Sequence, residues 1–116
     1  MADKTSISIV ASSKVEGFHN WPSAPKQHEF LSSCHRHIFY IKVKKTVRHT
    51  NREIEIISLV RTIRKFLLLK YGDPCNFGDR SCESIALEIV EEFGVDSCEV
   101  LEDEENGAIV ERTVVK

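Results

Sequence analysis

Two histidines separated by a single residue, His35 and His37, lie within the segment SSCHRHIFYIKVKK (residues 32–45). Side chains two positions apart in an extended strand point to the same side, so both imidazoles can reach one point in space. Imidazole nitrogens are common ligands of zinc and other transition metals. The pair therefore predicts part of a metal site, and the neighbouring Cys34 places a thiol beside it.

A third ligand is available at the end of an earlier segment. His19 closes TSISIVASSKVEGFH, in which isoleucines alternate with polar residues as in a half-buried strand. If this strand pairs with the strand that begins at His35, residues 19 and 35 lie at the same end. Three histidines with an open fourth position are typical of catalytic zinc sites, because neutral imidazoles leave the ion strongly Lewis-acidic. The spacing alone leaves open the alternative that these are polar residues at a strand end.

Size and charge limit the protein that can carry such a site. The chain has 116 residues, of which 41% are hydrophobic. This is enough for one core but not for two, so residues 1–116 are expected to form a single domain. The net charge of -2 gives no general attraction to polyanions, so neither nucleic acid nor a membrane surface is an expected partner.

The N-terminal stretch MADKTSISIVASS has no positive segment followed by an apolar one, and no run of about 18 apolar residues occurs in the chain. A cytoplasmic location is the resulting expectation. Cysteines stay reduced in that compartment, and none of the four cysteines belongs to a C-x-x-C pair. A disulfide scaffold is therefore not expected.

The periodicity of apolar residues predicts strands and helices in the order β-β-α-α-β-β. Strands are predicted at residues 5–19 and 35–47, with a proline-containing loop at residues 20–33 between them. Helices are predicted at residues 54–72 and 81–94. A hairpin is predicted at residues 97–115 around Asn106-Gly107, a dipeptide preferred in type I′ turns. Two helices on one face of a four-stranded antiparallel sheet would give an α+β fold.

Four motifs on these elements carry a family resemblance. GFHNWP, HRHIFYIKV, SCESIA and VLEDEENGAIV resemble, in this order, segments of the 6-pyruvoyl-tetrahydropterin synthase and 6-carboxy-tetrahydropterin synthase family, which has the T-fold, or tunnelling fold. The resemblance spans most of the chain. It implies a T-fold domain, a homo-oligomer, and a zinc-dependent carbon-oxygen lyase that acts on a dihydroneopterin triphosphate-like pterin.

The resemblance also implies roles for individual residues. Zinc would be bound by His19, His35 and His37. Glu102 would anchor the pterin, since a carboxylate can accept two parallel hydrogen bonds from the edge of a 2-aminopyrimidinone ring. Glu83 belongs to the matching start of the second helix and is a further candidate for substrate binding.

This sequence departs from the family where the family enzymes move protons. Their cysteine lies four residues before the first histidine of H-x-H, which here is Leu31. Cys34 is expected to point away from the histidines, because it is adjacent to His35 on a strand, unless a bulge redirects it. The family's Asp-His relay has no counterpart in KYGDPCNFGDRS, which contains no histidine. Glu55 can supply a substitute carboxylate, although a glutamate at a helix start is also a common dipole partner.

Two classes of function follow from these matches and losses. The first is a zinc-dependent lyase of the pterin-synthase type, with Cys34 or Glu55 as candidates for the missing proton-transfer group. The second is a catalytically impaired module that binds a purine- or pterin-like small molecule, or a protein partner. A homo-oligomer is expected in either case, because a four-stranded sheet leaves two edges and one face uncovered.

Overall fold

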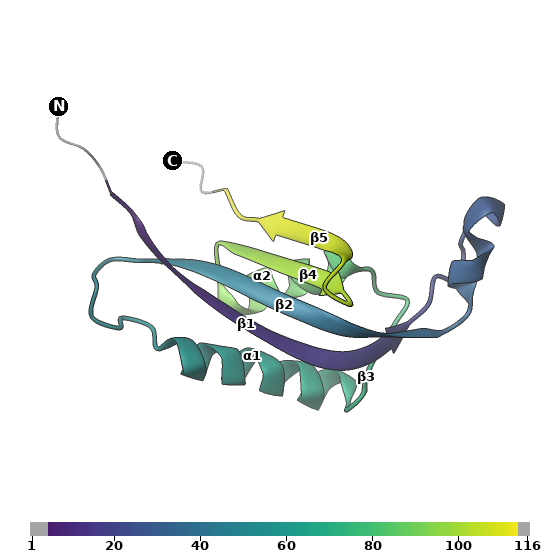
Figure 1. The fold of residues 1–116 in the computed structure, drawn as a ribbon, viewed down its shortest axis with the longest axis horizontal. Coiled ribbons are helices and arrows are strands. Elements are labelled where there is room, and N and C mark those ends of the chain that lie inside the picture. The colour runs from purple at the N-terminus through teal and green to yellow at the C-terminus, as the bar shows by residue number, and fades with distance from the viewer. Residues whose placement is uncertain (1–4, 114–116) are drawn as a thin grey trace.

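The computed structural model describes residues 5–113 and is drawn in Figure 1. The elements in chain order are β1 (Ile7–His19), the short 3-10 helix η1 (Lys26–Ser32), β2 (His35–Val47), α1 (Ile56–Tyr71), β3 (Cys75–Gly78), α2 (Cys82–Phe93), β4 (Ser97–Glu102) and β5 (Asn106–Glu111). Among the described residues, no helix is both long enough and apolar enough to cross a bilayer.

The sheet corrects the predicted fold. The protein is of the α+β class, but its sheet is mixed and has five strands in the order β3-β1-β2-β4-β5. The prediction of a four-stranded antiparallel sheet with the order β-β-α-α-β-β was therefore wrong. The additional strand, β3, lies in a segment interpreted as a loop and pairs in parallel with the end of β1. Its four residues are flanked by glycine, proline and aspartate, and a strand that short has no readable alternation.

Strands β1 and β2 form one long antiparallel pair and confirm the expected pairing. Their register runs without a shift from Ile7 opposite Val47 to His19 opposite His35. Side chains alternate between the two faces of the sheet, so odd-numbered residues of both strands face the same way. Val15 and Phe39 are buried on this face.

The turn between β4 and β5 lies earlier than predicted. Asn106 and Gly107 belong to β5, where they pair with Glu102 and Leu101, and the turn consists of residues 103–105. Gly107 serves a different purpose from the predicted one, because a Cβ atom there would lie 1.8 Å from the carbonyl oxygen of Val100. Residues 114 and 115 of the predicted hairpin lie outside the described residues.

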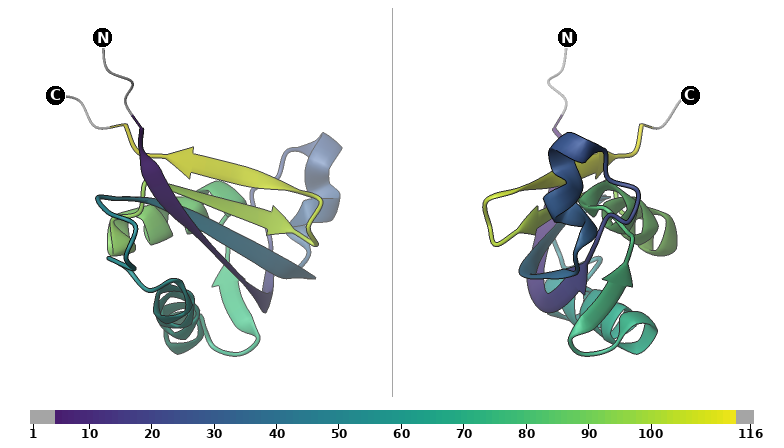
Figure 2. Two further views of the ribbon diagram at one scale, coloured as in Figure 1. Left: turned by 60° about the vertical axis from the view of Figure 1, so that its left-hand side comes forward. Right: turned by 90° about the vertical axis from the view of Figure 1, so that its right-hand side faces the viewer.

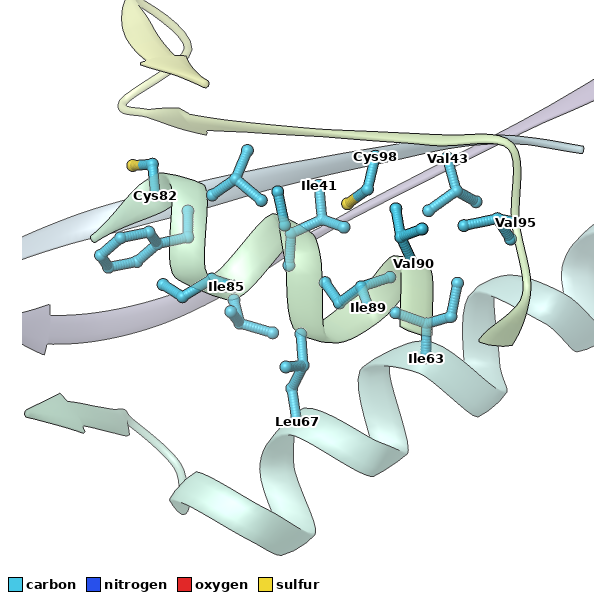
Figure 3. Close-up of a cluster of buried hydrophobic side chains, with 14 of the residues drawn as sticks. Ile41, Val43, Ile63, Leu67, Cys82, Ile85, Ile89, Val90, Val95 and Cys98 are labelled. Carbon is cyan, nitrogen blue, oxygen red and sulfur yellow. The ribbon is translucent and has the colours of Figure 1, made fainter. Parts of the chain in front are cut away.

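The two α-helices cover one face of the sheet (Figures 1 and 2). Helix α1 packs against β1 and β3, and α2 packs against β4 and β5. Figure 3 shows Ile63 and Leu67 of α1 directed toward Ile85 and Ile89 of α2. Val43 of β2 and Cys98 of β4 lie on the other side of α2. These contacts belong to one continuous apolar core, in which Leu67 is fully buried. The core ends near the N-terminus of α2, and polar side chains continue the same sheet face beyond it.

Substituting alanine for a buried and for an exposed leucine of α1 tests how this helix packs on the core. Leu67 is 0% exposed and Leu69 is 77% exposed. Leu67→Ala should lower the free energy of unfolding by about 2–5 kcal/mol, because it removes buried methyl groups and leaves a cavity. Leu69→Ala should change it by less than about 0.5 kcal/mol. Urea unfolding followed by circular dichroism measures both, and equal effects would contradict the packing described.

Candidate metal centre

Strand register brings four polar side chains to one end of the sheet. His19, the last residue of β1, is paired with His35, the first residue of β2. Glu102, the last residue of β4, is paired with Phe39. It therefore lies diagonally across from His37 on the same face, within reach of a long side chain. The structure thus places Glu102 together with the three histidines that the sequence suggested as ligands.

The four side chains form a compact cluster. One ligand atom from each of His19, His35, His37 and Glu102 lies within 4.8 Å of all the others. The ring centroid of His19 is 4.6 Å from that of His35 and 5.5 Å from that of His37. Zinc bonds to nitrogen and oxygen are about 2.0–2.2 Å long, so atoms on one ion are about 4 Å apart at most. Small side-chain movements would bring the cluster to that size, and it can hold a metal ion.

Each histidine is held through its Nδ1 atom. Nδ1 of His19 lies 2.8 Å from the carbonyl oxygen of Arg80, and Nδ1 of His35 lies 2.9 Å from the carbonyl oxygen of Ser33. Nδ1 of His37 lies 2.7 Å from Oδ2 of Asp103. Carbonyl and carboxylate oxygens only accept hydrogen bonds, so each Nδ1 must carry the proton and donate it. In the neutral rings the lone pair is then on Nε2, the tautomer and orientation that metal-ligating histidines adopt.

The close contact between His19 and Glu102 is stable only with a proton or a metal ion between the two side chains. Nε2 of His19 is buried without a hydrogen-bond partner of suitable geometry among the described residues, although Oε2 of Glu102 lies 2.8 Å away. Two lone pairs at this distance repel unless a proton or a metal ion lies between them. The Glu102 contact accordingly raises the pKa of His19, against the lowering effect of burial, and His19 lowers the pKa of Glu102. Positive charge is therefore favoured at this point.

A pocket of about 760 Å³ opens beside the cluster. One wall comes from the loop after β1 and from η1, which contribute Trp21, Phe30 and Leu31. A further part of the lining is the segment that leads into α2, residues 79–83, which includes Arg80 and Glu83. The loop of residues 20–33 therefore forms one side of a ligand-sized opening above the histidines.

Of the residues proposed for substrate binding and catalysis, Glu83 lines the pocket and Cys34 does not. Glu83, in the first turn of α2, lines the pocket. Cys34 is exposed and is not among the residues that line it. Leu31, at the position of the family cysteine, does line it but offers no group that can carry a proton. The pocket therefore lacks a thiol at the position that the family uses.

Glu55 lies at the far end of the long strand pair. It caps α1 by accepting hydrogen bonds from the backbone N–H groups of Ile57 and Ser58, which lower its pKa. Its neighbours there include Ile7 and Val47, the residues at the opposite end of the β1–β2 pair from the histidines. The structure therefore gives Glu55 a helix-capping role at the end of the β1–β2 pair remote from the histidines.

Two contributors to the cluster were not predicted from the sequence. Asp103 accepts hydrogen bonds from His37 and, through Oδ1 at 2.9 Å, from the backbone N–H of Ile38. The other is the backbone carbonyl of Arg80, whose guanidinium group donates to Ser84 Oγ at 3.0 Å. Asp103 directly follows Glu102 and could have been noticed as a second carboxylate at the strand end. A backbone carbonyl has no sequence signature.

Comparison of the sequence with models of known protein families found no match, and neither did comparison with curated proteins.

The hydrogen bond from His37 to Asp103 leads to a measurable expectation. Asp103→Asn should weaken the affinity for Zn²⁺ about 10- to 100-fold, the usual effect of losing such a partner of a ligating histidine. Asparagine tolerates the positive φ of 56° at this position, so the turn should persist. Competition with a chromophoric chelator measures the affinity.

Glu105→Gln is the matched control, because it removes one negative charge from the same turn at an exposed side chain. Its affinity should equal that of the unmodified protein. Equal weakening in both variants would attribute the effect to overall charge and not to the orientation of His37.

Proposed function

We propose that the four-residue cluster binds zinc. Three imidazoles and one carboxylate are nitrogen and oxygen donors that zinc accepts in tetrahedral sites. The observation that carries the proposal is that Nδ1 of all three histidines is engaged by an oxygen from another residue, which leaves every Nε2 free for a metal. A buried Nε2 of His19 without a hydrogen-bond partner among the described residues supports the same conclusion.

Elemental mass spectrometry of protein purified without a histidine tag tests the zinc proposal. We expect close to one zinc per chain, and loss of the metal in His35→Ala. His49→Ala is the control, because His49 is exposed and lies beside the end of β2 remote from the cluster. Absence of metal from the unmodified protein, or loss of metal in the control as well, would contradict a site at the three histidines.

We further propose that the pocket binds a pterin-like molecule and that the protein is a 6-pyruvoyl/6-carboxy-tetrahydropterin synthase-like lyase. All four motifs that carry this resemblance contribute to one pocket, although they are far apart in the sequence. The motifs supply His19 and Trp21, then His35 and His37, then Glu83, and then Glu102. Unrelated matches would have no reason to meet at one place, so their convergence supports the proposal.

The residues of the pocket have distinct parts in this proposal. Zinc, when bound, supplies a Lewis acid that polarises an oxygen of the pterin side chain. Glu83 can accept hydrogen bonds from ring N–H groups, and Trp21 offers an apolar face to a planar ring. The dihydroneopterin triphosphate-like substrate is implied by the resemblance alone, since Arg80 is the one cationic side chain among the pocket-lining residues described.

A second function is favoured by a specific observation. General acid-base catalysis contributes about 10²- to 10⁴-fold to a rate, and Leu31 occupies the family position of the thiol while Cys34 is exposed outside the pocket. A module that binds a purine- or pterin-like molecule, or a protein partner, without turning over the family substrate would tolerate these losses. A homo-oligomer and a cytoplasmic location stay predictions under both functions.

Trp21 provides a direct test of pterin binding, because it is the only tryptophan of the chain and lines the pocket. Addition of neopterin to the zinc-loaded protein should quench its fluorescence saturably, because a bound ring approaches the indole. Glu83→Gln should weaken binding by about tenfold, the cost of about one hydrogen bond to a charged group. Free tryptophan amide corrects for absorption by the pterin.

Turnover distinguishes the two functions. Release of triphosphate from dihydroneopterin triphosphate by the zinc-loaded protein would support the lyase. Saturable quenching without release would support the binding module, and the absence of quenching would contradict both pterin proposals.

A further inference from the structure

Glu102 occupies a position where two roles compete. The family resemblance implies that the carboxylate of Glu102 accepts hydrogen bonds from the ring of the bound pterin. In the structure the same carboxylate lies inside the histidine cluster, with Oε2 2.8 Å from Nε2 of His19 and 3.6 Å from Nε2 of His37. A single carboxylate oxygen that is close to two ligating nitrogens is placed for the metal and not for a ring outside the cluster.

The role of Glu102 determines whether the metal has three or four protein ligands. Three histidines leave one position of a tetrahedral zinc ion open to water or substrate, whereas three histidines and a carboxylate fill all four. Filled sites are typical of structural zinc, and catalytic sites keep a position open. Whether Glu102 binds the metal therefore decides whether a ligand can reach it.

We propose that Glu102 is the fourth metal ligand in the ligand-free protein, and that an external ligand reaches the metal only when this carboxylate leaves it. The inference rests on the zinc proposal. Once displaced, the carboxylate is free to accept hydrogen bonds from a bound ring. The metal-binding and ring-anchoring roles of Glu102 then alternate and do not coexist.

The anchoring of the cluster indicates which ligand would leave. Each histidine is attached through Nδ1 to a separate oxygen, from Arg80, Ser33 or Asp103. Glu102 is the last residue of β4, it is followed by two residues with positive φ, and its side chain is 27% exposed toward the pocket. A flexible side chain at the pocket wall can turn away while the three imidazoles keep their positions.

Cobalt(II) in place of zinc makes the coordination visible, because its visible absorption changes in intensity and wavelength with the number of ligands. Thiocyanate is a small anion that binds an open metal position. The cobalt spectrum of the unmodified protein should be that of a four-coordinate ion and should not change at thiocyanate concentrations that saturate the response of Glu102→Ala. In Glu102→Ala, thiocyanate should shift the spectrum saturably, and the cobalt affinity should fall about tenfold or more, at least the loss seen for an outer partner.

Asp79→Asn is the matched control, because it removes a negative charge from the pocket wall without touching the cluster, and Asp79 has no assigned part in ligand binding. It should stay as insensitive to thiocyanate as the unmodified protein. A response in this control equal to that of Glu102→Ala would attribute the effect to pocket charge and overturn the inference. Glu102→Gln, which preserves the shape of the side chain, replaces Glu102→Ala if the alanine variant does not fold.

The remaining outcomes separate this inference from the zinc proposal. If the unmodified protein with cobalt bound responds at the same thiocyanate concentrations as Glu102→Ala, the three-histidine site is already open, and only the role of Glu102 is overturned. Failure of the unmodified protein to bind cobalt or zinc would overturn the metal proposal and the inference with it.

Discussion

The unbroken register between β1 and β2 is the constraint on which the site depends. Side chains alternate along a strand, so a slip by one residue would move every side chain to the other face. The register is stabilised by the core, where Val15 lies opposite Phe39 and both are buried. The alternation that buries these residues also places His19 and His35 on the same face. The apolar core thus fixes the geometry of a polar cluster that lies beyond its edge.

This dependence explains what the sequence could predict. His35 and His37 were recognised by their spacing of two, and His19 by its place at the end of an alternating segment, so each was found through the period that positions it. The helices were found by their apolar periodicity. The second was predicted at residues 81–94, and in the structure Ser81 caps α2 and Gly94 ends it in a left-handed conformation.

The features that escaped prediction depend on non-local contacts. Strand β3 exists because the end of β1 offers an edge to pair with, and its four residues carry no period of their own. The β4–β5 turn follows from the pairing of Glu102 with Asn106, which overrides the local preference for a turn at Asn106-Gly107. The resemblance suggested Glu102 as a pterin anchor, but its place inside the histidine cluster depends on the pairing of β2 with β4, which the run EDEEN does not indicate.

The origin of the ligands also links the site to the stability of the fold. His19, His35 and Glu102 come from three strands and are widely separated in the sequence, so a metal bound to them would close long loops of the unfolded chain. Metal affinity of this kind adds directly to folding free energy, because the unfolded chain has no preformed site. Without a cation, the lone pair on Nε2 of His19 and the carboxylate of Glu102 would repel each other at the end of the core. The cluster therefore lies where the apolar packing ends, and a bound metal there would connect three strands beyond the core.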